Sequence, residues 1–153
     1  MTARNKFILT GEWLQELLTG LKDNEDKTVF KKVLLGYDKD KIRAFGDGVI
    51  ATCYVTGVPS TNETLSKHNR PEYLNGFIAF IIKGSNEAKY KKAAHIMDLI
   101  HEKYEHDKTW WKLETPERVV RDTDLVRSEL SLAPSNNNLD IVGSFELRHH
   151  VYK

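Results

Sequence analysis

Two amphipathic segments, each preceded and followed by strand-like runs, constrain the fold of this chain more than any other feature. In the first segment, apolar residues recur at three- and four-residue spacing, which predicts the buried stripe of a helix. Thr10 stands before this stripe as a candidate N-cap, and Gly20 lies near its end as a candidate stop. A short apolar run, Lys6 to Leu9, predicts a strand ahead of the helix. The stripe consists of Trp13, Leu14, Leu17, Leu18 and Leu21.

The second amphipathic segment predicts the longest helix of the chain, from Glu87 to about His106. Ser85 or Asn86 stands where a helix N-cap is expected, because both side chains can accept a backbone N–H. Asp107 and Lys108 follow as the expected end. The predicted buried stripe consists of Tyr90, Ala93, Ala94, Met97, Ile100 and Tyr104.

The rest of the chain is rich in strand-like runs separated by turn residues. Both faces of the run at 49–55 are apolar enough for burial, which predicts an interior strand. Turns are expected at 38–41 and 134–138, and the TPERVVRDTD stretch is read as a loop or an edge segment. The predicted strands are Thr28 to Tyr37, Ile42 to Phe45, Val49 to Val55, Tyr73 to Lys83, Trp110 to Leu113, Leu125 to Ala133 and Leu139 to Val151.

The order of these elements predicts a single α+β domain over residues 1–153, with an antiparallel sheet and two helices. The first part, 1–57, reads strand, helix, strand, strand, strand, and the part from 73 to 153 repeats that order. The polar stretch at 58–72, with two prolines, joins the two halves as a loop. A loop of this length is more often functional or mobile than a simple link.

Two consecutive strand-helix-strand-strand-strand units are similar to one domain of the DNA sliding clamps, the processivity factors of replicative polymerases. FILTGEWLQELLTGLKD resembles the opening strand and helix of such a domain, and KIRAFGDGVIATCYV resembles a hairpin with an Asp-Gly turn. This resemblance implies a clamp-like fold, self-association edge to edge, and helices that face DNA. The first helix departs from that pattern, because its exposed side carries Glu12 and Glu16, which repel phosphate.

Composition narrows the classes of function. The formal net charge is +1, so the total charge does not indicate a nucleic-acid or membrane partner. The single cysteine, Cys53, excludes a disulfide within the chain and a zinc site with four cysteines. No apolar run is long enough to predict a transmembrane helix. We therefore expect a cytoplasmic protein that has no membrane partner and needs no cofactor.

The strongest candidate binding site is a stretch of basic and aromatic residues along and after the second helix. Lysine can neutralise phosphate, and an aromatic ring can stack on a base or anchor a protein partner. An alternative is that one tryptophan is core and the lysines are a solvated face. The candidate residues are Lys89, Lys91, Lys92, Lys103, Lys108, Trp110, Trp111, Lys112, Arg118 and Arg121.

Residues with catalytic potential form weaker patterns. His95, His101 and His106 are six and five residues apart, so a shared metal on one helix face is not expected. His149 and His150 should point to opposite faces of a strand. Cys53 is expected to be a buried small hydrophobe rather than a nucleophile. Paired carboxylates could come from Asp122, Asp124 and Glu129, or from Asp38, Asp40 and Asp47.

The leading hypothesis is a non-enzymatic, clamp-like protein that associates with DNA or with an assembly, for example in replication, and acts as a homo-oligomer. The last strand, which ends LRHHVYK, is the candidate edge for self-association. A second hypothesis is a small inhibitor or adaptor that binds a protein through 58–72 and Trp110 and Trp111. The third is an enzyme that assembles scattered histidine and aspartate side chains.

Overall fold

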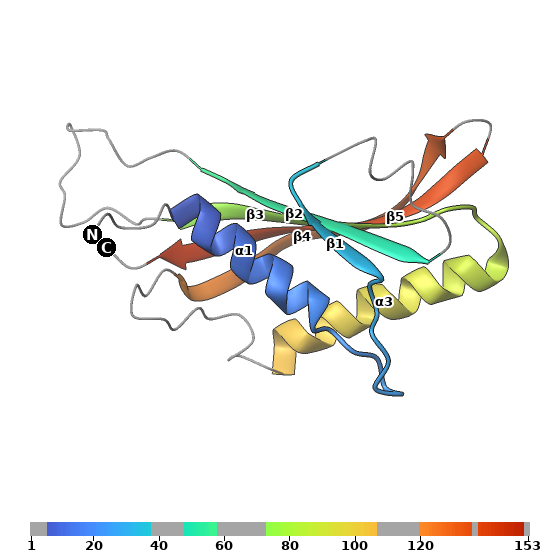
Figure 1. Ribbon diagram of the computed structural model, residues 1–153, viewed down its shortest axis with the longest axis horizontal. Coiled ribbons are helices and arrows are strands. Elements are labelled where there is room, and N and C mark those ends of the chain that lie inside the picture. Colours follow the sequence, from blue (N-terminus) through green and yellow to red (C-terminus); the bar gives the residue numbers. More distant parts are fainter. Residues whose placement is uncertain (1–5, 38–47, 58–72, 107–119, 136–137, 152–153) are drawn as a thin grey trace.

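A computed structural model of the chain describes residues 6–37, 48–57, 73–106, 120–135 and 138–151. Within these ranges the chain forms two α-helices and five β-strands, and it belongs to the α+β class (Figure 1). The elements are α1 (Lys6–Thr19), β1 (Lys32–Leu35), β2 (Val49–Thr56), β3 (Tyr73–Ile82), α3 (Glu87–His106), β4 (Val120–Ser135) and β5 (Asn138–Val151).

The five strands form one mixed sheet with the order β1-β2-β3-β5-β4. The β1–β2 pair is parallel, with Val33 opposite Ala51, and the other three pairs are antiparallel. The expectation of a wholly antiparallel sheet is therefore wrong at β1. Two backbone hydrogen bonds, from Lys31 N to Val49 O and from Gly36 N to Cys53 O, extend the parallel ladder beyond both ends of β1.

Both helices cover the same face of the sheet, so the molecule has two layers (Figure 1). α1 packs on β1 and β2, and α3 packs on β5 and β4. The ring of Trp13 meets the His149 ring edge-on from α1, and the His101 ring meets Phe145 in the same way from α3. Since the sheet alternates its side chains, the buried residues of β3 and β5 that face the helices fall at every second position.

The predicted strand at Lys6 to Leu9 is wrong, because these residues form the first turn of α1. Thr10 is consequently inside the helix and fully buried, instead of capping it. Gly11 lies where a Cβ would come within 2.9 Å of Leu35 Cδ1, so glycine lets α1 approach β1 closely. The predicted end is confirmed, since Gly20 N donates the last hydrogen bond of the helix, to Glu16 O.

The second helix is confirmed from Glu87 to His106. Asn86 caps it, with its Oδ1 accepting a hydrogen bond from Lys89 N at 2.9 Å. The buried residues are Ala93, Ile96 and Ile100, whereas Tyr90 is 55% exposed. The predicted stripe is therefore wrong at its N-terminal end, where Tyr90 faces solvent.

Apart from Lys6 to Leu9, each predicted strand within the described residues contains a strand, with shifted ends. β2 is interior, as predicted, and its first five residues are buried. The run at 28–37 is a strand only at Lys32–Leu35. Pro134 and Asn138, predicted to lie in a turn, belong to β4 and β5. The predicted turn at 38–41, the strands at 42–45 and 110–113, and the loop at 58–72 lie outside the described residues.

Two glycines in the sheet make room for large neighbours. Gly143 of β5 lies directly opposite Phe80 of β3, and a Cβ at Gly143 would overlap the Phe80 ring. A Cβ at Gly76 would in the same way overlap the His149 ring, which lies at the next-but-one pair of the same two strands. Phe80 and His149 are both fully buried, so each ring occupies the space that the glycine leaves.

Candidate functional site

The described basic residues of the candidate site lie on α3, and most of them already have partners. Lys89 Nζ donates to the carbonyl oxygen of Lys83 at 2.7 Å and ties the helix to the end of β3. Lys91 Nζ lies 3.0 Å from Glu87 Oε1, one helical turn away. Lys103 lies half-buried near the C-terminus of α3 and has a partner as well. These contacts leave Lys92 as the most available cation of the four.

The remaining predicted site residues follow α3. Arg121 lies in β4, but its side chain is not described. Lys108, Trp110, Trp111, Lys112 and Arg118 lie outside the described residues, so their role stays a prediction.

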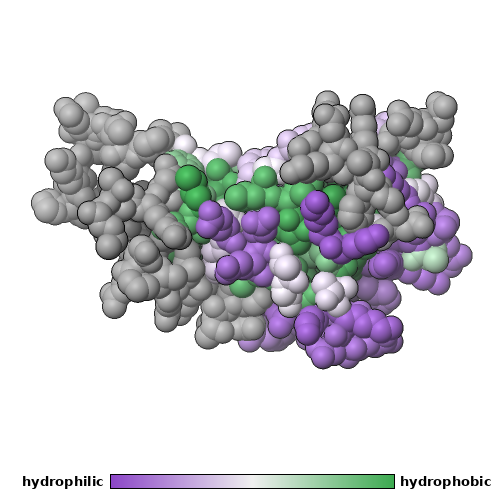
Figure 2. Space-filling model, in the orientation of Figure 1, coloured by the Kyte–Doolittle hydropathy of each residue, from purple (hydrophilic) through white to green (hydrophobic). Residues whose placement is uncertain are grey.

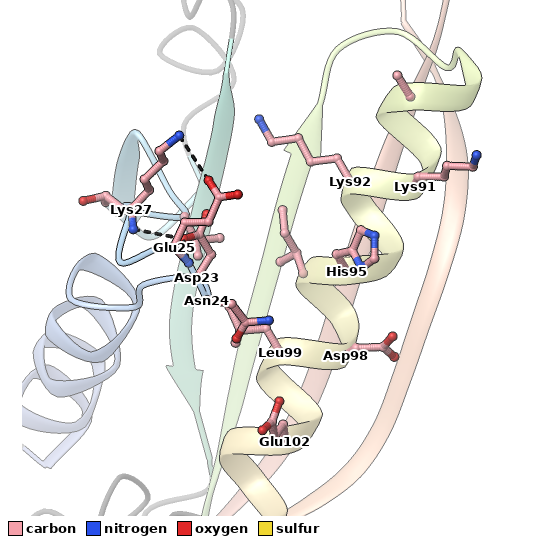
Figure 3. Close-up of a pocket in the computed structure, with 14 residues that line it drawn as sticks. Asp23, Asn24, Glu25, Lys27, Lys91, Lys92, His95, Asp98, Leu99 and Glu102 are labelled. Atoms are coloured by element: carbon pink, nitrogen blue, oxygen red, sulfur yellow. Dashed lines mark hydrogen bonds and ion pairs between the residues drawn. The ribbon is translucent and has the colours of Figure 1, made fainter.

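A groove of about 810 Å³ runs between α3 and the segment 23–29 (Figure 3). Lys92 and Leu99 extend from α3 toward that segment, whereas Lys91 and Asp98 point away from it. Val29, Ile96 and Leu99 contribute apolar surface to the groove. Sequence reasoning missed this site because its two walls are at least 59 residues apart along the chain, from Val29 to Ala88.

The charges around the groove are mixed. The acidic residues Asp23, Glu25, Asp98 and Glu102 line it together with Lys27, Lys91 and Lys92. Asp23 is already engaged, because its Oδ1 accepts the backbone N–H groups of Glu25 and Lys27 at 2.9 Å. Lys27 also pairs with Glu25 at 3.2 Å. The visible surface of α3 is hydrophilic (Figure 2). Because acidic residues alternate with the lysines, this surface is poorly suited to binding the phosphates of a nucleic acid.

The histidines of α3 do not converge. His95 is exposed beside the groove, while the Nε2 of His101 lies 3.0 Å from Ser128 Oγ on β4. His106 is exposed and lies 3.8 Å from Glu105. Within the described ranges, no three His, Cys, Asp or Glu side chains gather closely enough to hold a metal ion.

His149 and His150 face opposite sides of β5, as predicted. His150 Nε2 contacts Asp124 Oδ2 at 2.7 Å on the face away from the helices. His149 is fully buried, and its Nδ1 lies 2.9 Å from Thr123 Oγ1. Its Nε2 has no hydrogen-bond partner among the described residues, and burial, aided by the charge of His150, lowers its pKa to about 3. His149 is therefore a neutral core residue near pH 7.

Each candidate carboxylate on β4 already contacts a nearby group of β4 or β5. Asp122 Oδ1 accepts the backbone N–H of Thr123, Asp124 holds His150, and Glu129 pairs with Arg127 at 3.1 Å. They therefore do not form a free acid–base pair. The second predicted set, Asp38, Asp40 and Asp47, lies outside the described residues.

Cys53 is buried in β2, as predicted, and its Sγ lies 3.8 Å from the carbonyl oxygen of Gly11. Burial raises its pKa from 9.0 to about 12. We expect the native thiol to react with a thiol reagent roughly a thousandfold more slowly than the unfolded chain, because three pKa units reduce the thiolate fraction by that factor. Timed reaction with a chromogenic disulfide, with and without denaturant, measures this; equal rates would contradict it.

The face of the sheet away from the helices carries paired aromatic and charged side chains. Tyr54 and Phe77 stack with their ring centroids 4.9 Å apart, and Arg148 lies 4.9 Å above the centre of the Tyr73 ring. A shallow hollow of about 240 Å³ lies beside the stacked pair, with Arg127 and Glu146 at its margin. The charges of this face are balanced between acids and bases.

β4 is an edge of the sheet, and it is the longest strand, with 16 residues. The prediction that the last strand is an edge is therefore wrong, because β5 lies between β3 and β4. Among the described residues, no element pairs with the side of β4 that faces away from β5. Val126 and Leu132 on this strand are 47% and 54% exposed. The edge is thus long and partly apolar.

No family model matches the chain, and no curated protein matches it. Neither described helix is long and apolar enough to cross a membrane.

Proposed function

We propose that this chain is a non-enzymatic assembly protein that binds a protein partner through the outer edge of its sheet. The observation that carries the proposal is β4, a 16-residue edge strand without a neighbour on its outer side in the described chain. The outward backbone N–H and C=O groups of such a strand can form a ladder with an added strand. Exposed Leu132 adds apolar surface at the same place.

The chemistry of the described side chains supports a non-enzymatic role. Catalysis by a nucleophile needs a reactive group beside a base, and both must be accessible to a substrate. Cys53 is buried with a raised pKa, and His149 is buried with a lowered one. The half-buried His150 directs its Nε2 at a carboxylate oxygen, Asp124 Oδ2 at 2.7 Å, and not at a nucleophile. The third hypothesis, an enzyme, is therefore the least supported.

Association with DNA in a clamp-like arrangement is the second candidate. The order strand, helix, strand, strand in β3, α3, β4 and β5 covers part of the second proposed unit, whose strand at 110–113 lies outside the described residues, whereas the first unit lacks its opening strand. Exposed Lys91 and Lys92 near the N-terminus of α3 favour DNA contact, and Asp98, Glu102 and Glu105 oppose it. The inhibitor or adaptor that would bind a protein through 58–72 and Trp110 and Trp111 involves residues outside the described ranges and stays a prediction.

Mass in solution, measured by light scattering with and without duplex DNA at low salt, tests the two candidates. We expect the measured mass to exceed that of the monomer and to rise with protein concentration. Adding duplex DNA should not change this mass. A monomer at every concentration would refute self-assembly. Retention of DNA that is lost in Lys91→Glu/Lys92→Glu, but kept in the control Lys32→Glu on β1, would instead support the DNA candidate.

A further inference from the structure

One segment of the β4 edge is regular enough to pair with another strand. The register between β4 and β5 shifts at Val120/Asp122 and again at Leu125/Arg127. From Arg127 to Ser135 the pairing is unbroken, and Ser131 is the midpoint of that segment. The segment runs into the outer end of the β4–β5 hairpin, which projects from the sheet in Figure 1. The regular part of the β4 edge therefore begins after the second irregularity, at Arg127.

Pro134 indicates which backbone groups of this segment face outward. Proline has no N–H, and within sheets it occurs where its nitrogen faces away from the neighbouring strand. Pro134 lies opposite Leu139, next to the pair of Ser135 and Asn138 at the end of the hairpin. Because backbone groups alternate along a strand, Ser128, Leu130 and Leu132 should also direct their N–H and C=O groups away from β5.

We infer that the partner at this edge is a second copy of the chain, paired antiparallel to β4 about a two-fold axis at Ser131. In this register Leu130 of each copy stands opposite Leu132 of the other. The outward N–H and C=O groups of the two leucines then bond to each other, and Ser128 N–H meets the carbonyl of Pro134. A two-fold axis makes every contact occur twice. The inference specifies the partner for the proposed assembly function and rests on it.

The side chains of the segment are compatible with this register. Leu132 is 54% exposed and would gain an apolar neighbour, while Leu130 already packs partly on the core. Arg127 would face Ser135, and Glu129 would face Ala133, so no like charges are opposed. An axis at Ser128 would set Arg127 against Glu129, but it would bring the irregularity at Val126 into the ladder. The unbroken register therefore favours Ser131.

A cysteine at the axis tests the register directly. In Ser131→Cys the two thiols would lie on directly opposed, non-hydrogen-bonded residues, whose Cα atoms are about 4.5 Å apart. That separation is within disulfide range. We expect most of the chain to run as a covalent dimer after mild oxidation with diamide. Buried Cys53 should not compete.

The matched control is Ala133→Cys, two residues along the same strand. Its two thiols would be separated by four residues along the ladder, or about 14 Å, so we expect little covalent dimer. Equal crosslinking of both variants, or none in Ser131→Cys, would overturn the register. If light scattering still gave an oligomer in that case, the assembly function would stand while this inference failed.

Leu132→Lys tests the edge without a crosslink. The charge would stand against Leu130 of the second copy, and we expect self-association to weaken at least tenfold. The control is Leu35→Lys, because Leu35 is a similarly exposed leucine, at 46%, on β1 at the opposite edge. If association were lost in Leu35→Lys but kept in Leu132→Lys, the interface would lie at the β1 edge of the sheet. That result would refute the inference. Circular dichroism verifies that both variants are folded.

Discussion

Replacing Gly143 with alanine is expected to lower the free energy of unfolding by about 3 kcal/mol, at the upper end of the usual cost of overpacking a core. The added Cβ would overlap the Phe80 ring and lie 2.9 Å from Met97 Sδ. Phe80 has no exposed surface, and β5 is held between two strands. Neither the ring nor the strand can move away without breaking other contacts, so the strain persists in the folded state.

Urea unfolding measures this effect, with Gly20→Ala as the matched control. A Cβ at Gly20 would meet the carbonyl oxygens of Glu16 and Leu17 at ordinary distances of 3.5 and 4.0 Å, so its cost should be below about 1 kcal/mol. Adding Phe80→Leu to Gly143→Ala should return part of the lost stability, because the smaller side chain leaves room for the methyl group. Equal unfolding midpoints for Gly143→Ala and Gly20→Ala would show that the close approach is not rigid.

Acidification from pH 7 to pH 5 is expected to lower stability by about 2 kcal/mol through His149 alone. The pKa of His149 is about 3 in the folded chain, compared with an ordinary value of 6.5. Protons therefore bind the unfolded chain more tightly. The stabilising contribution is complete above pH 6.5 and is lost progressively as the pH falls toward 3. Carboxylates add their own effects mainly below this window, so the range from pH 7 to 5 separates the effect of His149 from theirs.

His149→Asn tests the origin of this pH dependence. Asparagine retains a polar atom that can meet Thr123 but does not titrate, so stability at pH 7 should fall while its decrease between pH 7 and 5 becomes shallower. His95→Asn, on the exposed side of α3, is the control and should keep the wild-type slope. An unchanged slope in His149→Asn would show that another group causes the acid sensitivity.

Local sequence signals predicted the elements whose neighbours in sequence determine them. The limits of α3 follow from Asn86 as the cap and from the helical spacing that brings Ala93 and Ile100 onto one face. β2 was readable as interior because both of its faces are apolar. The run at Lys6 to Leu9 failed because four apolar-rich residues fit a strand and a helical turn equally well. Only the packing of α1 against β1 decides between them.

Features that depend on contacts distant in sequence could not be read in this way. The position of β5 between β3 and β4 made β4 an edge, and the pattern of the last strand contains no sign of that order. The groove required the segment 23–29 to meet α3. The pairing of Lys89 with the Lys83 carbonyl, which removes one lysine from the predicted basic patch, depends on the turn between β3 and α3. The local spacing of apolar and polar residues indicates neither the order of strands in a sheet nor contacts between distant segments.

The parallel pairing of β1 with β2 has a consequence for the order in which the molecule folds. β4 and β5 join residues as close as Ser135 and Asn138, so their hairpin closes a very short loop. β1 instead must align with β2 across the intervening chain, and its four residues gain little until β2 is already in place. We therefore expect the C-terminal hairpin to form early, and β1 to join the sheet only after β2. During synthesis from the N-terminus, Trp13 of the first helix can reach its ring contact with His149 only after β5 has been made.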